Sequence, residues 1–227
     1  MKFSDLTNSL VRLPLCCLSV IVFYSLPLTA HADDDDKALF IPSNSAAKNF
    51  YGGIALGYGD NDYPLSNQDG SVTGSSRDRH DTVTDFYIGY QFNERLSVQA
   101  GHTDLGHSSF KGSSSGGPSW DAGSVSAKHD ADGWELGVMG RWPVAPRWYA
   151  LGYVGWMWWE SKETFVESTG TSVVKESGSD ATYALGFEYD IGRKDRVVYR
   201  FMGSHHKVGD QGYDVNSATA EIVYRFP

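Results

Sequence analysis

The most constraining feature of this 227-residue chain is an alternation of apolar with polar or small residues that recurs, with a period of two, in eight segments. Alternation of this kind is typical of β-strands with one apolar face. Each segment is about ten residues long, which is the length that a tilted membrane strand requires. The eight apolar sets are Gly52-Ile54-Leu56-Tyr58, Phe86-Ile88-Tyr90-Phe92, Leu96-Val98-Ala100, Trp134-Leu136-Val138-Gly140-Trp142, Tyr149-Leu151-Tyr153, Tyr183-Leu185-Phe187-Tyr189, Val197-Tyr199-Phe201 and Ala218-Ala220-Ile222-Tyr224-Phe226.

The connections between these segments alternate strictly between short and long. The short ones are 93–94, 143–146 and 192–195, and the long polar ones are 59–81, 103–131, 162–179 and 207–214. In an outer-membrane barrel the short turns face the periplasm and the long loops face outside, whereas a soluble sandwich has no reason to sort its loops. The sequence therefore predicts an all-β fold, an eight-stranded antiparallel up-and-down transmembrane β-barrel. The Gly/Ser-rich stretch 110–120 is predicted to be a mobile loop.

The second face of the predicted strands mixes glycine with charge. Glycines weaken a strand, and a water-facing surface gains nothing from them, but the narrow lumen of an eight-stranded barrel needs small residues beside charged ones. The alternative is a set of ordinary solvated surface charges. We predict that the charged residues form a linked network that closes the lumen; its members are Asp85, Glu135, Arg141, Glu188, Arg200, Glu221 and Arg225.

Aromatic residues gather at the two ends of the predicted strands, as expected where a barrel crosses the membrane–water interfaces. The predicted interfacial aromatics are Tyr90, Trp142, Trp148, Tyr149, Trp159 and Tyr189. The segment 156–159 carries tryptophan on both faces. Trp156 and Trp158 are therefore expected to cap the lumen from inside, unless a bulge at Gly155 reverses that assignment.

The N-terminus has the pattern of a secretory signal. Residues 13–28 are apolar and lead to Ala30-His31-Ala32, a small-x-small triplet that a signal peptidase cuts. We predict a signal peptide at 1–32, a periplasmic segment at 33–48 and an outer-membrane β-barrel domain at 49–227. An uncleaved anchor is the alternative. Lipidation at Cys16 or Cys17 fits poorly, because Leu13-Pro14-Leu15 lacks small residues. Residues 33–37 match an enterokinase site and are either a native acidic tip or an engineered remnant.

The charge of the chain bears on its partners. The chain has 19 Lys and Arg against 28 Asp and Glu, a net charge of −9. Loss of the first 32 residues makes this −10, because Lys2, Arg12 and Asp5 leave with them. Nucleic acid is excluded as a partner, since phosphate binding needs a basic footprint. Both cysteines leave as well, so the exported chain has no disulfide.

Three internal motifs and the C-terminus carry a resemblance to a known family. Gly89-Tyr90-Gln91-Phe92, the element 101–106 (GHTDLG) and the element 185–190 (LGFEYD) resemble the OmpA-like outer-membrane β-barrel family, which includes opacity-type surface antigens. The resemblance covers residues 49–227 and implies outer-membrane lipid and lipopolysaccharide as surroundings, with a host or surface ligand at the long loops. The C-terminal residues Ile222, Tyr224 and Phe226 look like the signal that barrel-assembly machinery reads. Pro227 after the last aromatic departs from the pattern, and no peptidoglycan-binding domain is expected to follow.

Candidate catalytic and metal-binding groups are few. His107-Ser108-Ser109 and Ser204-His205 supply a serine and a base, without an evident orienting acid. His205-His206, with His102 or Asp104, would suit a metal poorly, because adjacent histidines on a strand point to opposite faces. We therefore predict no catalytic residues, no cofactor and no metal, and a structural or surface-interaction role through long extracellular loops. The alternatives are a narrow porin-like channel for small solutes and, behind it, a lipid A-modifying enzyme.

Overall fold

The computed structural model describes residues 49–61, 70–191, 196–209 and 213–226. The predicted segments 1–32 and 33–48 and the predicted turn 192–195 lie outside these residues. No helix in the described part is long and apolar enough to cross a membrane. Its strands are β1 (Phe50–Asn61), β2 (Val72–Asp78), β3 (His80–Gln91), β4 (Leu96–Ser114), β5 (Gly123–Ala145), β6 (Trp148–Glu167), β7 (Gly170–Asp190), β8 (Val197–Val208) and β9 (Tyr213–Arg225).

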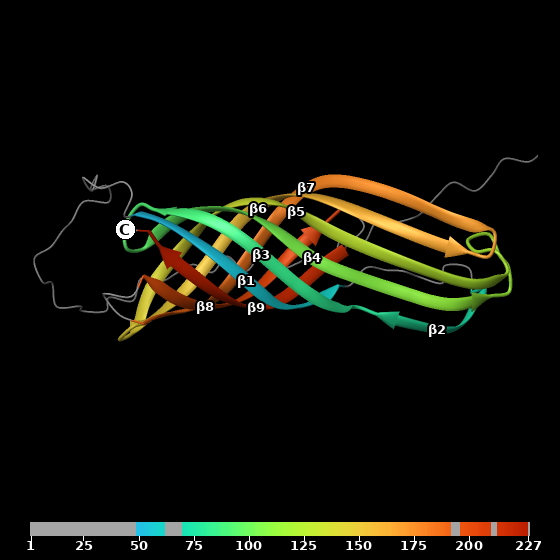
Figure 1. Ribbon diagram of the computed structural model, residues 1–227, viewed down its shortest axis with the longest axis horizontal. Coiled ribbons are helices and arrows are strands. Elements are labelled where there is room, and N and C mark those ends of the chain that lie inside the picture. The colour runs from blue at the N-terminus through green and yellow to red at the C-terminus, as the bar shows by residue number, and fades with distance from the viewer. Residues whose placement is uncertain (1–48, 62–69, 192–195, 210–212, 227) are drawn as a thin grey trace, which may run out of the picture. The chain divides into compact units, whose positions relative to one another are not determined.

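Eight of these strands close into a ring. Each pairs antiparallel with its neighbours in the order β1-β3-β4-β5-β6-β7-β8-β9, and β9 returns to β1, where Tyr51 lies opposite Arg225 (Figure 1). β2 is not a ninth member of the ring, because it pairs with β4 just beyond the stretch that pairs with β3. Only Arg79 separates β2 from β3, so the two form one interrupted strand. The predicted eight-stranded antiparallel barrel is confirmed.

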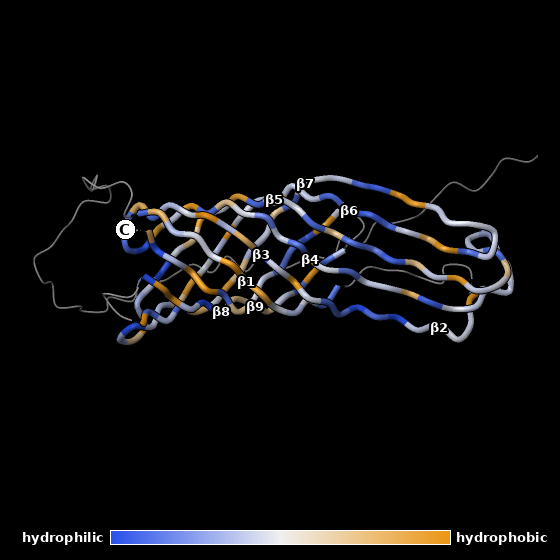
Figure 2. The backbone as a smooth tube through the Cα atoms, in the orientation of Figure 1, coloured by the Kyte–Doolittle hydropathy of each residue, from blue (hydrophilic) through white to orange (hydrophobic). Residues whose placement is uncertain are grey.

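The apolar face of most strands points out of the ring. Ile54 on β1 and Leu185 on β7 are 63% and 74% exposed. In contrast, Val198 on β8 and Val223 on β9, which lie on the inner faces of those strands, are fully buried. Figure 2 shows hydrophobic positions concentrated along the closed part of the barrel and fewer along the hairpins that extend beyond it. An outer surface of this kind is suited to lipid and not to water.

Strand β6 has the opposite orientation from the predicted one. Leu151 and Tyr153, expected to face lipid, are buried, while Val154 is 67% exposed. The pairing of β5 with β6 is regular through Gly155, so no bulge intervenes. Trp156 and Trp158 follow Val154 on the outer face and are about half exposed, which shows that they do not cap the lumen. The predicted orientation was wrong because both faces of this strand carry large apolar residues.

Two of the long connections are largely strand. β4 and β5 leave only residues 115–122 between them, and β6 and β7 leave only 168–169, so both hairpins extend well beyond the ring (Figure 1). The loop expected at 110–120 is wrong for its first five residues, which belong to β4, whereas residues 115–122 do connect β4 to β5. Phe110 and Trp120 are buried with Val72, Val125 and Ala127 in a cluster against Phe165. This apolar inner surface holds the extended sheet together.

The short turns at the other end are tightly closed. The Asn93 side-chain oxygen accepts hydrogen bonds from the backbone N–H groups of Arg95 and Leu96 at 2.8 and 2.9 Å. Arg147, between β5 and β6, adopts a positive φ of 67°, a conformation in which a β-hairpin can turn within very few residues. These turns, with the first residues of β1 and the last of β9, define one end of the barrel.

Candidate functional site

A buried carboxylate inside the barrel is held by three arginines. Glu188 of β7 is fully buried. Its Oε1 lies 2.8 Å from Arg141 Nε of β5 and 2.7 Å from an Arg225 guanidinium nitrogen of β9, and its Oε2 lies 2.8 Å from Arg200 Nε of β8. A buried charge is tolerated only with such partners and good geometry. The structure thus brings four of the seven predicted network residues into one cluster, here called the Glu188 cluster.

Two further groups complete this cluster at the short-turn end. The Asp190 carboxylate lies 3.3 Å from Arg225. The Arg141 guanidinium lies over the Tyr149 ring, 3.1 Å from its centroid. Tyr149 is therefore turned toward the interior, and not toward the interface where the sequence placed it. A cation over an aromatic face is attracted by the ring quadrupole, which helps to hold Arg141 in place.

The other three predicted network residues line a small cavity in the middle of the barrel. Asp85, Glu135 and Glu221 surround a space of about 50 Å³, together with His206 and Met202. Such a volume holds a few water-sized molecules. Tyr87 links the two groups, since its hydroxyl contacts Glu221 and accepts a hydrogen bond from Arg200 at 3.3 Å. The alternation places Tyr87 on the inner face with Asp85, but it does not show which charged groups the Tyr87 hydroxyl contacts.

Glycines make room for the tyrosines that cross the interior. A Cβ atom on Gly53 would collide with the Tyr87 ring, and one on Gly89 would collide with the Tyr51 ring. The Tyr51 hydroxyl donates to Ser97 Oγ at 3.1 Å. The small residues on the inner face therefore allow aromatic rings, as well as charges, to fill the lumen.

An apolar cluster fills the barrel beyond the cavity, toward the long hairpins. Leu105, Ala131, Met157, Trp159, Val208, Tyr213 and Val215 are all buried there. Trp159 is 6% exposed, and its indole N–H donates to Asp180 at 2.9 Å. It is thus an interior residue, contrary to the interfacial position that the sequence predicts, because β6 has the reversed orientation. The cavity lies between this apolar plug on one side and the Glu188 cluster on the other.

His129 lies above the apolar plug, on the part of β5 that extends beyond the ring. Its ring packs against Tyr213 with centroids 4.6 Å apart, and the residue is 3% exposed. Burial lowers the pKa of His129 from 6.5 to about 4, which the neighbouring Asp130 opposes. The imidazole is therefore neutral at neutral pH.

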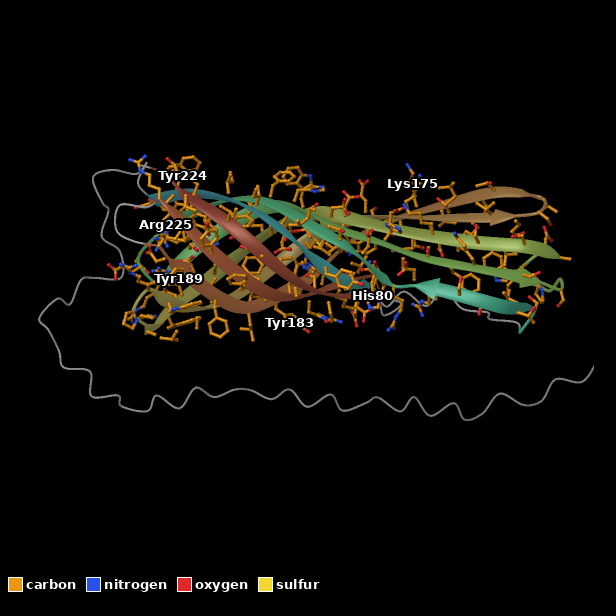
Figure 3. All side chains as sticks on the ribbon, turned by 60° about the horizontal axis from the view of Figure 1, so that its bottom comes forward. His80, Lys175, Tyr183, Tyr189, Tyr224 and Arg225 are labelled. Carbon is orange, nitrogen blue, oxygen red and sulfur yellow. The ribbon has the colours of Figure 1, made fainter. Side chains whose placement is uncertain are left out.

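The outward-facing aromatics form two groups along the barrel. Figure 3 shows Tyr189 and Tyr224 near the short-turn end and Tyr183 and His80 toward the extended hairpins. Trp142 and Trp148 are 51% and 41% exposed at the first end. Tyr90 contacts Phe50 and Phe92 there. Ile222, Tyr224 and Phe226 lie on the outer face of the last strand and its end, each between 40% and 50% exposed.

The two serine–histidine pairs considered as catalytic candidates do not form hydrogen bonds within the described residues. His107 contacts Asp81, while the hydroxyl of Ser108 is buried without a hydrogen-bond partner. Ser204 bonds His206 at 3.2 Å and Ser217 at 2.6 Å inside the barrel. His205 instead faces Asn216, at 2.8 Å. No group of three or more His, Cys, Asp or Glu residues in the described part could hold a metal ion.

A closed ring of strands with an apolar outer surface and buried charges inside defines a transmembrane β-barrel. The sequence matches the OmpA-like transmembrane domain over residues 45–227, and the chain belongs to this family. The protein is accordingly an outer-membrane protein. No curated protein matches the sequence.

Several solved structures resemble the chain. The attachment invasion locus protein Ail of Yersinia pestis is 13% identical, with 78% of this chain and 99% of Ail covered and a TM-score of 0.47. Neisserial surface protein A is 13% identical, with 78% and 97% covered and a TM-score of 0.46. OprG of Pseudomonas aeruginosa is 13% identical, with 79% and 97% covered and a TM-score of 0.44.

Proposed function

We propose that this protein is a structural and surface-interaction barrel, with a closed interior and with the β4–β5 and β6–β7 hairpins outside the cell. Beyond the ring, β2, β4, β5, β6 and β7 form an open five-stranded sheet. An open sheet has two edges, and each edge offers a row of backbone groups to another chain. The barrel, which lies in the membrane, anchors this sheet at the cell surface.

The free edge of β7 is the observation that carries the proposal. Within the described residues, Gly170–Ala181 pairs with β6 on one side and with no strand on the other. Val173 and Val174, on opposite faces of this stretch, are 50% and 44% exposed. An extended peptide adds to such an edge through main-chain hydrogen bonds, and side-chain contacts then give specificity. We propose that a host or surface ligand with an extended segment binds here.

A shortened hairpin tests this function. Lys162 and Lys175 lie directly opposite each other, so residues 163–174 can be replaced by an Asn-Gly turn while the ring remains unchanged. Expressing cells should then attach less to one another and to protein-coated surfaces. The matched control, Val173→Thr with Val174→Thr, keeps the edge backbone and should attach more strongly than the shortened form. Unchanged attachment by the shortened form would contradict the proposal.

A narrow channel for small solutes is the second candidate, favoured by the polar cavity between Asp85, Glu135 and Glu221. Conduction requires the Glu188 cluster and the apolar plug to open. Planar-bilayer recordings separate the two functions: a closed barrel gives no unitary conductance, and a channel lined by carboxylates gives a cation-selective one. Met157→Gly removes a large side chain from the apolar plug. If the protein is a channel, this variant should conduct more than the wild type.

We also propose two partners in the envelope. The apolar outer surface of the barrel lies in a membrane whose outer leaflet is lipopolysaccharide. The aromatic group nearer the extended hairpins, and the residues beyond it, would therefore contact this lipid. The exposed alternation of Ile222, Tyr224 and Phe226 supports recognition of the last strand by barrel-assembly machinery.

A further inference from the structure

A lysine-lined depression lies on the outer wall of the extended sheet. It has a volume of about 480 Å³ and is lined by Lys111 of β4, Lys128 of β5 and Lys162 of β6. Lys175 of β7 lies directly opposite Lys162 at its border, and Figure 3 shows Lys175 on the extended part, far from Tyr224. These four are most of the lysines after residue 49, which are Lys111, Lys128, Lys162, Lys175, Lys194 and Lys207.

In the described part of the chain, three of the four lysines form no ion pair, although Asp130 also lines the depression and lies directly opposite Lys162. Lys128 is paired with Asp130 at 2.6 Å. Within the described ranges, no ion pair is formed by Lys111, Lys162 or Lys175. Like charges directly opposite each other on neighbouring strands are destabilising, as for Lys162 and Lys175. A positive depression of this kind, in a chain with a net charge of −9, is complementary to an anionic ligand.

The position of the depression indicates which anion it meets. Trp158 faces outward at the membrane-proximal end of the extension, where aromatics mark the interface. Lys162 lies four residues further along the same face of β6, or about 13 Å at the usual strand rise. The lysines therefore lie beyond the hydrocarbon and next to lipid headgroups.

A row of carboxylates separates the tryptophans from the lysines. Asp104, Asp132 and Glu160 lie opposite one another on β4, β5 and β6, two residues beyond Trp134 and Trp158. This row disfavours anionic groups at the level of the aromatics. The complementary anion must extend further from the membrane, as the phosphorylated sugars of a lipopolysaccharide core do and the phosphates of lipid A do not.

We infer that the depression formed by Lys111, Lys128, Lys162 and Lys175 binds phosphate groups of the lipopolysaccharide core. This inference rests on the proposed outward orientation of the hairpins and on the proposed contact with lipopolysaccharide. The protein would thus carry a lateral binding site for the lipid that surrounds it, separate from the free edge of β7.

Lipid retention tests this site. The full chain is placed in phosphatidylcholine nanodiscs that contain no addition, lipid A alone, or lipopolysaccharide with a phosphorylated core, and retained lipid is measured by native mass spectrometry. The triple variant Lys111→Gln, Lys162→Gln, Lys175→Gln leaves the Lys128–Asp130 pair intact. It should retain several-fold less core-bearing lipopolysaccharide than the wild type. Lys207→Gln, which removes a lysine near Asp180, should retain the wild-type amount.

The controls decide among the outcomes. Replacing the same three lysines with arginine preserves charge and should restore retention, whether or not the glutamine variant folds well. The inference is overturned if the folded glutamine variant retains as much core-bearing lipopolysaccharide as the wild type. It is also overturned if the wild type retains lipid A alone as well as it retains core-bearing lipopolysaccharide. If the glutamine variant still shows hairpin-dependent cell attachment, the proposed function stands by itself, so failures of the two ideas are distinguishable.

Discussion

Glu188 of β7 and Arg200 of β8 are direct cross-strand partners inside the barrel, and their Oε2 and Nε atoms lie 2.8 Å apart. Arg200 is also the cross-strand partner of Glu221 on β9. This arginine therefore joins the Glu188 cluster to the side chains around the central cavity. Its removal would affect both.

Replacing Arg200 with alanine should destabilise the barrel by about 3–5 kcal/mol, because the change leaves a buried carboxylate with less compensation. The free energy of unfolding is measured by urea titration in lipid vesicles. Leu185→Ala is the matched control on the lipid-facing side, and it should cost less, since lipid fills the gap. The double change Glu188→Gln with Arg200→Met should recover much of the loss. An unchanged urea midpoint for Arg200→Ala would show that the ion pair contributes nothing.

The sequence predicted the ring well because every strand but one shows a clear difference between its faces. Residues 182–189 place Leu185 outside and Glu188 inside by parity alone, and the fold has them there. Parity also indicated the inner face that the Glu188 cluster occupies, but not the distances within it. Those depend on registers between strands, which the alternation does not specify.

Other features carried no such signal. In β6, Leu151 and Tyr153 on one face and Val154 and Trp156 on the other are equally apolar, so only pairing with β5 sets the orientation. The hairpin 162–179 is mostly polar and lacks a regular alternation, so the sequence predicted a loop there, although backbone hydrogen bonds hold it as strand. The apolar plug was missed because its members are scattered over five strands, and alternation within one strand does not show which inward residues of different strands meet.

The orientation of the barrel can be checked on intact cells. A protease-cleavable tag inserted beside Gly116, in the connection between β4 and β5, should be cut by added protease, because we expect the hairpins to face outside. The same tag at Asn93-Glu94 should be cut only after the outer membrane is permeabilised. Cleavage in the reverse pattern would invert the proposed orientation and remove the basis for a surface ligand.

Assembly should depend on the last aromatic residue. Deletion of Phe226 and Pro227 removes one of three outward apolar residues from the end of the chain and should sharply reduce the heat-modifiable, folded form in outer-membrane fractions. Deletion of Pro227 alone should leave the folded amount unchanged. If the shorter chain without Phe226 reached normal levels, the terminal residues would not form the proposed signal.

The stability of the barrel should fall on acidification because of His129. Burial holds its folded-state pKa at about 4, below the value of 6.5 for an unfolded chain. Above pH 6.5 neither state binds the proton and the full stability is present. As the pH falls from 6.5 toward 4, the unfolded state takes up the proton first, so the free energy of unfolding should fall by up to about 3 kcal/mol.

His129→Gln cannot take up the proton and should remove this part of the pH dependence, as measured by urea titration at pH 7.5 and about pH 4.5. If the His129→Gln barrel lost as much stability as the wild type between these two values, the imidazole would not be buried in its neutral form against Tyr213.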